Sequence, residues 1–333
     1  MTTAACASGN TSSRYSPIED YALIGDCHGS ALVGRDGSID WAALHRFDAD
    51  PVFCRILDAG RGGFWSIRPR DAFTTERAYL AGTNILRTVF STPSGRVAVT
   101  DFMPVGRRLD AGVNDYVHLN APAWIVRRVE GLQGNVTMQS TYRPSSEFTR
   151  KPVTLVADSG VLHAGAEMPM LHADLGFVVD GDKASAEWPV GAGQCHDMVL
   201  AGNSVAGEAP GARVAEFFDA TRAFWEEWIG YCRYHGPFED AVQRSALTLK
   251  LLTYAPTGAI VAAPTTSLPE AIGGERNWDY RFCWVRDSSF ALYALSVLGY
   301  SGEAQCFHEF LLGAIARSLP DVRPMYGIDG RRK

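Results

Sequence analysis

The stretch between Ala262 and Asp287 concentrates aromatic, guanidinium and carboxylate side chains. Its aromatic residues with flat apolar faces include Trp278, Tyr280 and Trp284. Its residues able to make charge-assisted, sometimes bidentate hydrogen bonds include Asp279, Arg281, Arg286 and Asp287. A sugar ring packs its axial C–H groups on aromatic faces, and its hydroxyls need donors and acceptors. The stretch therefore predicts a sugar-binding site.

Structural alternatives stay open for these residues when each is taken alone. Asp287 directly precedes an expected helix, so its carboxylate can cap that helix. Arg286 can be a structural ion-pair partner, and Trp284 can be a core residue. Catalysis by a nearby carboxylate would need a raised pKa and a second group across the scissile bond. The sequence indicates neither feature, so we assign no catalytic residue.

The elements that must position this stretch are helices with apolar faces. Apolar residues recur at three- and four-residue spacing from Ala212 to Cys232, which predicts an amphipathic helix. A second helix is expected from Pro237 to Pro256, with an inner face made by Val242, Ala246, Leu249 and Leu252. A third is expected over 288–298, and a fourth opens at Ser301 and ends before Pro320. The chain after residue 211 is therefore expected to be all-α, with a long functional connection between its second and third helices.

Short strands joined by turns are expected before residue 211. Three hairpins are predicted, over 31–41, 85–102 and 153–164, each with a glycine in its turn. Apolar and polar residues alternate along these strands, as in sheets with one buried face. The repeated strands favour an antiparallel β-sandwich and disfavour a parallel nucleotide-binding sheet. The fold class is thus α+β multidomain.

Composition excludes several function classes. The length of 333 residues suits about two domains. Hydrophobic residues make up 46% and charged residues 20%, which argues against a disordered chain. The net charge is −6 and the cations are spread along the sequence, so we expect no nucleic acid and no membrane as a partner. Residues 1–14 lack the pattern of a secretory signal and are expected to form a disordered tail.

The seven cysteines contain no Cys-x-x-Cys pair, which argues against a disulfide framework and a zinc site. Cys27–His28 and Cys195–His196 are adjacent pairs, but neighbours on a strand point to opposite faces. We therefore expect no metal, no cofactor, reduced thiols and a cytoplasmic location.

A family resemblance follows from longer segments. Residues 15–41 resemble the opening of bacterial glycoside hydrolase family 15 proteins, which are glucoamylase-like and trehalase-like enzymes. Residues 244–254, 262–270 and 277–287 resemble the beginning of the catalytic domain of that family. The resemblance implies an N-terminal β-sandwich over 15–210, a linker helix over 211–235, and the N-terminal part of an (α/α)6 barrel over 236–333.

The resemblance also implies roles for individual residues. Positions that match Arg286 and Asp287 hydrogen-bond the non-reducing terminal glucose in the family, and those that match Tyr280 and Trp284 shape the pocket around the ring. Trp278 and Asp279 are further candidates for binding the substrate, an α-glucoside or trehalose. The family cleaves with inversion, using one glutamate as acid and a second as base.

The acid and base of the family lie later in the barrel than the region that resembles it here. We therefore expect a chain that is incomplete within its catalytic domain, lacks both catalytic glutamates and is inactive alone. The alternative is a non-catalytic carbohydrate-binding or assembly protein that needs a second chain to supply the rest of the barrel. The residues leave open which α-glucosidic linkage is recognised and which oligomeric state forms.

Overall fold

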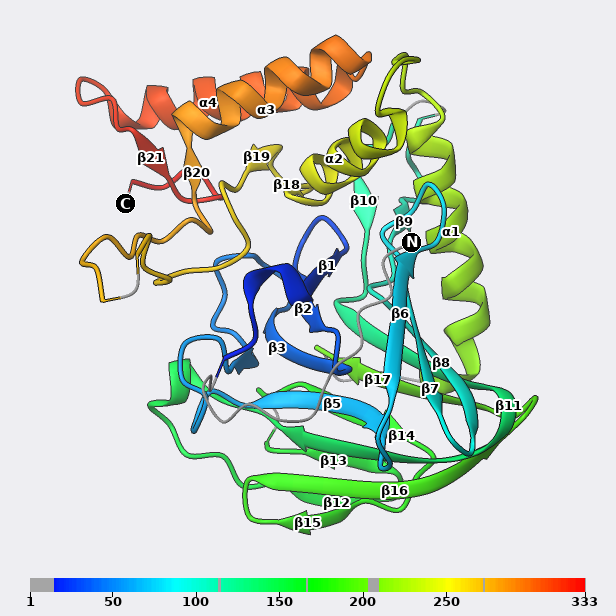
Figure 1. Ribbon diagram of the computed structural model, residues 1–333. Helices are drawn as coiled ribbons and strands as arrows, with labels where there is room; N and C mark the ends of the chain where they lie inside the picture. Colours follow the sequence, from blue (N-terminus) through cyan, green and yellow to red (C-terminus); the bar gives the residue numbers. More distant parts are fainter. Residues whose placement is uncertain (1–14, 113–114, 166, 203–209, 272, 333) are drawn as a thin grey trace.

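A computed structural model describes residues 15–112, 115–165, 167–202, 210–271 and 273–332 (Figure 1). The tail expected over residues 1–14 lies outside the described residues. A large antiparallel β region runs through Ala201 and is followed by helices. None of the helices in these ranges is both long and apolar enough to cross a membrane.

The β region is built from strands that pair only antiparallel, as the hairpin pattern predicts. Its strands are β1 (Tyr21–Gly25), β2 (Ser30–Gly34), β3 (Ser38–Ala43), β4 (Phe53–Cys54), β5 (Phe64–Pro69), β6 (Thr74–Tyr79), β7 (Leu86–Thr92), β8 (Gly95–Phe102), β9 (Gly106–Arg107), β10 (Leu119–Asn120), β11 (Trp124–Arg143), β12 (Val156–Asp158), β13 (Val161–His163), β14 (Met170–Ala173), β15 (Val178–Asp180), β16 (Lys183–Gly191) and β17 (Cys195–Ala201). The three predicted hairpins are confirmed as β2–β3, β7–β8 and β12–β13.

The long strand β11 joins two groups of strands. Its first part pairs with β8 and β17, and its second part pairs with β5 and β16. The register shifts between Gly131 and Gln133. A Cβ atom at Gly131 would lie 2.0 Å from the carbonyl oxygen of Gly191, so only glycine fits this close approach. Apolar residues of both groups, such as Phe90 and Met138, belong to one buried core.

A charged pair is sealed inside the β region. Arg127 is 0% exposed and Asp101 is 1% exposed, and Nε of the arginine lies 2.8 Å from the Asp101 carboxylate. The same guanidinium donates to the carbonyl oxygens of Trp65 at 2.9 Å and of Gly37 at 2.8 Å. Its donors are therefore directed to protein acceptors on three different segments, which ties the β2–β3 turn to β5 and β8.

The helices are α1 (Val214–Ile229), α2 (Glu239–Leu251), α3 (Val285–Leu298) and α4 (Gly302–Ser318). The apolar face predicted for the first helix is confirmed: Phe217 packs on Trp124 of β11 at one end of α1, and Trp228 stacks on Tyr300 at the other, with ring centroids 4.0 Å apart. α1 therefore links the β region to α3 and α4 (Figure 1). Short 3₁₀ helices η1 (Ile18–Asp20), η2 (Glu147–Thr149) and η3 (Pro210–Arg213) complete the helical elements of the described residues.

One prediction for this part of the chain is wrong in detail, and a second is incomplete. The part after residue 211 is not all-α, because two-residue strands close its loops: β18 (Thr253–Tyr254) pairs with β19 (Ala259–Ile260), and β20 (Cys283–Trp284) pairs with β21 (Met325–Tyr326). Of the inner face predicted for the second helix, Ala246 and Leu252 are buried and Val242 and Leu249 pack partly buried against the same core; the buried face of α2 also includes Leu247, Lys250 and Leu251.

Lys250 is buried because it meets a carboxylate inside the core. Its Nζ lies 2.8 Å from Glu303 of α4 and 2.7 Å from the carbonyl oxygen of Tyr116. Trp228 donates its indole N–H to the same carboxylate at 2.9 Å. The spacing of apolar residues along α2 cannot reveal that Lys250 is buried, because its partner Glu303 lies on a different helix.

Candidate functional site

The predicted sugar stretch forms a folded-back connection between β19 and β20. Its two arms are held by backbone hydrogen bonds from Ala263 to Tyr280 at 2.9 Å and from Ser267 to Trp278 at 3.1 Å. The connection extends away from the helices and beside the loops of the β region (Figure 1). We call residues 262–287 the sugar loop, after the binding function that the sequence predicts for them.

Tyr280 and Trp284 lie together as an aromatic wall. Their ring centroids are 5.9 Å apart and the ring planes are tilted by 33°. Trp284 is fixed in two ways, because its backbone pairs with Met325 and its indole N–H donates to the carbonyl oxygen of Asp279 at 3.0 Å. Both residues are half-buried.

Arg286 and Asp287 stand next to this wall at the beginning of α3. The guanidinium carbon of Arg286 lies 6.0 Å from the ring centroid of Trp284. Arg286 and Asp287 pair with each other at 3.1 Å, and their side chains are 69% and 35% exposed. The structure thus brings together four of the predicted site residues, and the two charged ones offer donors and acceptors at the surface.

The capping role considered for Asp287 is wrong. α3 begins at Val285, earlier than the expected residue 288, and Trp284 occupies the N-cap position without a side-chain capping bond. Asp287 lies inside the first turn, where a negative charge interacts favourably with the helix dipole.

Asp279 and Trp278 differ from the other candidates. Both carboxylate oxygens of Asp279 accept hydrogen bonds from Arg281, from Nε at 3.0 Å and from Nη2 at 2.8 Å. Trp278 is 52% exposed. Asp279 therefore organises the loop from within, while Trp278 lies half-exposed at the surface.

The neighbouring thiol of Cys283 is buried, which disfavours its reactive form. Burial raises the pKa of Cys283, which disfavours the reactive thiolate, and its sulfur contacts the Ser288 hydroxyl at 3.4 Å. Within the described ranges, no group of three or more His, Cys, Asp or Glu side chains is arranged to hold a metal ion. The chemistry that the loop offers is hydrogen bonding and ring stacking.

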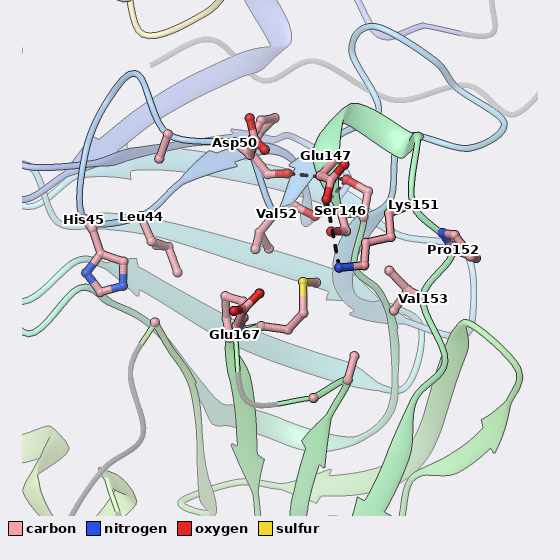
Figure 2. Close-up of a pocket in the computed structure, with 18 of the residues that line it drawn as sticks. Leu44, His45, Asp50, Val52, Ser146, Glu147, Lys151, Pro152, Val153 and Glu167 are labelled. Carbon is pink, nitrogen blue, oxygen red and sulfur yellow. Dashed lines mark hydrogen bonds and ion pairs between the residues drawn. The ribbon is translucent and has the colours of Figure 1, made fainter.

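A cavity of about 1020 Å³ in the β region was not predicted. Its lining comes from residues within 44–52 and 145–154, from residues 164–165 and 167–169, and from Gly202. Figure 2 shows His45 and Lys151 at opposite ends of the cavity, with Glu147 and Glu167 on facing sides. Glu147 and Lys151 form an ion pair at 3.9 Å. Because these polar residues come from loops far apart in the chain, no local pattern could have pointed to the cavity.

Arg281 was expected with Asp279, Arg286 and Asp287 to offer hydrogen bonds to a sugar, but its guanidinium is directed at the protein itself. It is 6% exposed, and its Nη1 donates to the carbonyl oxygen of Ala49, in the loop between β3 and β4, at 2.8 Å. The only sequence feature that pointed to Arg281 was its position in a loop rich in Asp and Arg, and this feature does not indicate the contact with Ala49.

Comparison with known families gives two matches that follow each other along the chain. The family described as "Glycosyl hydrolases family 15" matches residues 236–333, and the family described as "Trehalase-like, N-terminal" matches residues 9–201.

Several curated proteins are similar to the chain over nearly its whole length. A trehalase of Mycolicibacterium smegmatis is 32% identical over 96% of this chain and 51% of its own length. A trehalase of Thermoplasma volcanium is 32% identical over 95% of this chain and 50% of its own length. A trehalase of Mycobacterium tuberculosis is 33% identical over 96% of this chain and 50% of its own length. The chain therefore spans about half the length of the curated relatives it matches.

Proposed function

The chain belongs to glycosyl hydrolases family 15 and carries the trehalase-like N-terminal region, and from this membership we propose that its sugar loop binds the terminal glucose of trehalose or another α-glucoside. The observation that carries the proposal is the wall of Tyr280 and Trp284 with Arg286 and Asp287 exposed beside it. The aromatic wall receives the apolar face of the ring, and the charged pair exchanges its mutual hydrogen bonds for bonds to sugar hydroxyls. The trehalases among the relatives favour trehalose.

The glucoamylase and trehalase type of hydrolysis needs two carboxyl groups about 6.5–9.5 Å apart, one as acid and one as base. Arg281 occupies both carboxylate oxygens of Asp279, Arg286 pairs with Asp287, and Glu270 faces Arg276 at 3.6 Å. We therefore propose that these carboxylates serve binding and loop geometry. On this proposal the chain binds the sugar but does not hydrolyse it alone.

The domain assignment is part of the same proposal. We propose a β-sandwich over 15–210, a linker helix over 211–235 and the N-terminal part of an (α/α)6 barrel over 236–333.

Four buried cysteines without a disulfide, Cys27, Cys54, Cys232 and Cys283, support a reducing compartment and hence a cytoplasmic location.

A second candidate function, assembly with further barrel helices, is favoured by one face of α3. Phe290, Tyr293 and Val297 lie at helical spacing and are 72%, 72% and 65% exposed. Exposed apolar patches of this kind mark interaction surfaces. The occupant that fits is a helix packed on α3, as in an (α/α)6 barrel.

Calorimetric titration with trehalose, maltose and isomaltose tests the binding proposal. We expect the chain to bind trehalose, and Arg286→Ala or Asp287→Asn to weaken binding about tenfold, the effect of losing about 1.4 kcal/mol. Arg276→Ala is the matched control, because this exposed arginine lies in the same loop and pairs with Glu270. Equal affinity in the Arg286 variant and the wild type, or no binding of any of the three sugars, would contradict the proposal.

A further inference from the structure

Arg281 connects the sugar loop to the β region. Its Nη1 donates to the carbonyl oxygen of Ala49 at 2.8 Å, and its guanidinium carbon lies 5.3 Å from the ring centroid of Phe148. Both contacts are far away in sequence, since Ala49 follows β3 and Phe148 belongs to η2. The side chain is only 7% exposed, so it bridges two parts of the protein from a buried position.

The opposite edge of the same guanidinium holds the sugar loop. Nε and Nη2 of Arg281 grip the two carboxylate oxygens of Asp279, at 3.0 Å and 2.8 Å. The carbonyl oxygen of Asp279 in turn accepts the indole N–H of Trp284 at 3.0 Å. An unbroken series of contacts therefore runs from Ala49 through Arg281 and Asp279 to Trp284. Tyr280, the other ring of the wall, lies between Asp279 and Arg281 in the chain.

The segment that carries Phe148 is held in an unusual backbone conformation. Glu147, Phe148 and Thr149 have φ values of 50°, 52° and 69°, which residues other than glycine rarely adopt and which cost energy. Such strain persists only where the surroundings fix it, and it is concentrated at functional sites. Here Ser145 anchors the segment by donating its backbone N–H to the carbonyl oxygen of Val52 at 2.8 Å. The strained turn thereby places the Phe148 ring against Arg281.

We propose that Arg281 is a positioning residue through which the β region sets the orientation of the aromatic wall of the sugar loop. The proposal rests on the sugar-binding function proposed above and adds the part of the chain that controls its geometry. A planar guanidinium can hold the two Asp279 oxygens along one edge while it donates to Ala49 from another nitrogen. A lysine at this position has one ammonium group and cannot reproduce that arrangement.

The first test follows the indole N–H signal of Trp284 in nitrogen–proton correlation spectra of the full chain. The signal is assigned by its loss in Trp284→Phe. We expect Arg281→Lys to displace this signal, because the Asp279 carbonyl that it bonds is no longer held. Arg276→Lys is the control, since Arg276 lies in the same loop with a side chain that is 75% exposed, and it should leave the signal in place.

The second test measures trehalose affinity by calorimetry in the same variants. Arg281→Lys is expected to weaken binding about tenfold, whereas Arg276→Lys leaves it unchanged. Phe148→Leu removes the ring that faces the guanidinium but keeps an apolar side chain. Phe148→Leu is expected to displace the Trp284 signal less than Arg281→Lys does. If Arg281→Lys does not fold, Phe148→Leu tests the positioning role in its place.

The outcomes separate the two proposals. A Trp284 signal that stays in its wild-type position in a folded Arg281→Lys variant, or in Phe148→Leu if the lysine variant is unfolded, overturns the positioning role. If Arg281→Lys displaces the Trp284 signal but the wild-type chain binds none of the sugars, the positioning contact stands and the sugar-binding function is overturned. A displaced signal with unchanged trehalose affinity overturns the link between Arg281 and binding.

Discussion

Two arginine–aspartate pairs, one in the β region and one in the sugar loop, have similar geometry and opposite surroundings. Arg127 and Asp101 approach to 2.8 Å with side chains that are 0% and 1% exposed. Arg286 and Asp287 approach to 3.1 Å with side chains that are 69% and 35% exposed. The buried guanidinium also donates to two carbonyl oxygens, so its bonds are directed to the protein itself. The exposed pair can exchange its partners for a ligand.

The comparison teaches that burial and satisfied partners, rather than residue type, separate a structural charged pair from a pair that we propose to bind a ligand. Arg281 and Asp279 lie between the two extremes, with side chains that are 7% and 25% exposed. Arg281 is buried like the first pair and Asp279 is partly buried, and both lie in the same loop as the second pair. Their position agrees with a role in holding the binding residues.

The largest expected effect comes from breaking the buried pair. Arg127→Met leaves the Asp101 carboxylate buried without its partner, and we expect the free energy of unfolding to fall by about 3–5 kcal/mol. Urea unfolding of the full chain measures the change.

The double variant Arg127→Met with Asp101→Leu is the control, because it removes both charges and should recover much of the loss. If the single variant loses less than about 1 kcal/mol, the pair does not organise the β region as its burial indicates.

A smaller loss is expected from Glu303→Gln in the helical part of the chain. Burial raises the pKa of Glu303, but attraction to Lys250 and hydrogen bonds from Lys250 and Trp228 lower it more, so the pKa lies below its ordinary value. A carboxyl with a depressed folded pKa contributes stability above its unfolded pKa of about 4.3, and this contribution is lost as the pH falls through the lower folded pKa.

The glutamine variant should therefore lose about 2 kcal/mol at neutral pH and show a weaker fall in stability below about pH 4. Urea unfolding at a series of pH values measures both. If stability falls with decreasing pH as steeply in the glutamine variant as in the wild type, a group other than Glu303 causes the fall.

A still smaller effect on stability is expected for Arg286→Met. Exposed ion pairs contribute about 0–1 kcal/mol, so unfolding by urea should change by less than about 0.5 kcal/mol. The substitution is the same as in Arg127→Met, so burial is the difference under test. A loss near that of the β-region variant would show that Arg286 is a structural residue.

Local features of the sequence were sufficient to predict much of the fold. The turns around Gly37 and Gly160 and the alternating strands beside them identified hairpins, because neighbouring residues determine these elements. The face of α1 followed from its helical period for the same reason. The beginning of α3 was misplaced because Trp284 supplies no recognisable capping side chain.

The candidate site could be predicted only in part. Tyr280, Trp284, Arg286 and Asp287 lie within one short segment, so their composition pointed to them together. Arg281 depends on Ala49, which is 232 positions away along the chain, and no local pattern reveals such a contact. The cavity of the β region was missed for the same physical reason, since its lining comes from separate loops.

The smallest effect on the free energy of unfolding is expected from substitutions on the exposed face of α3. The β region and α3 differ most in how far their large apolar residues are exposed. Large apolar residues of the β region, such as Trp65 and Phe90, are fully buried, whereas Phe290 and Val297 are 72% and 65% exposed. Replacing both with serine should therefore change the free energy of unfolding by no more than about 0.5 kcal/mol, because little contact is lost. It should also reduce binding of a fluorescent apolar dye, since the exposed patch is removed. Dye titration and urea unfolding at several protein concentrations measure both effects. A loss above about 1 kcal/mol that grows with concentration would show that copies of the chain already cover this face.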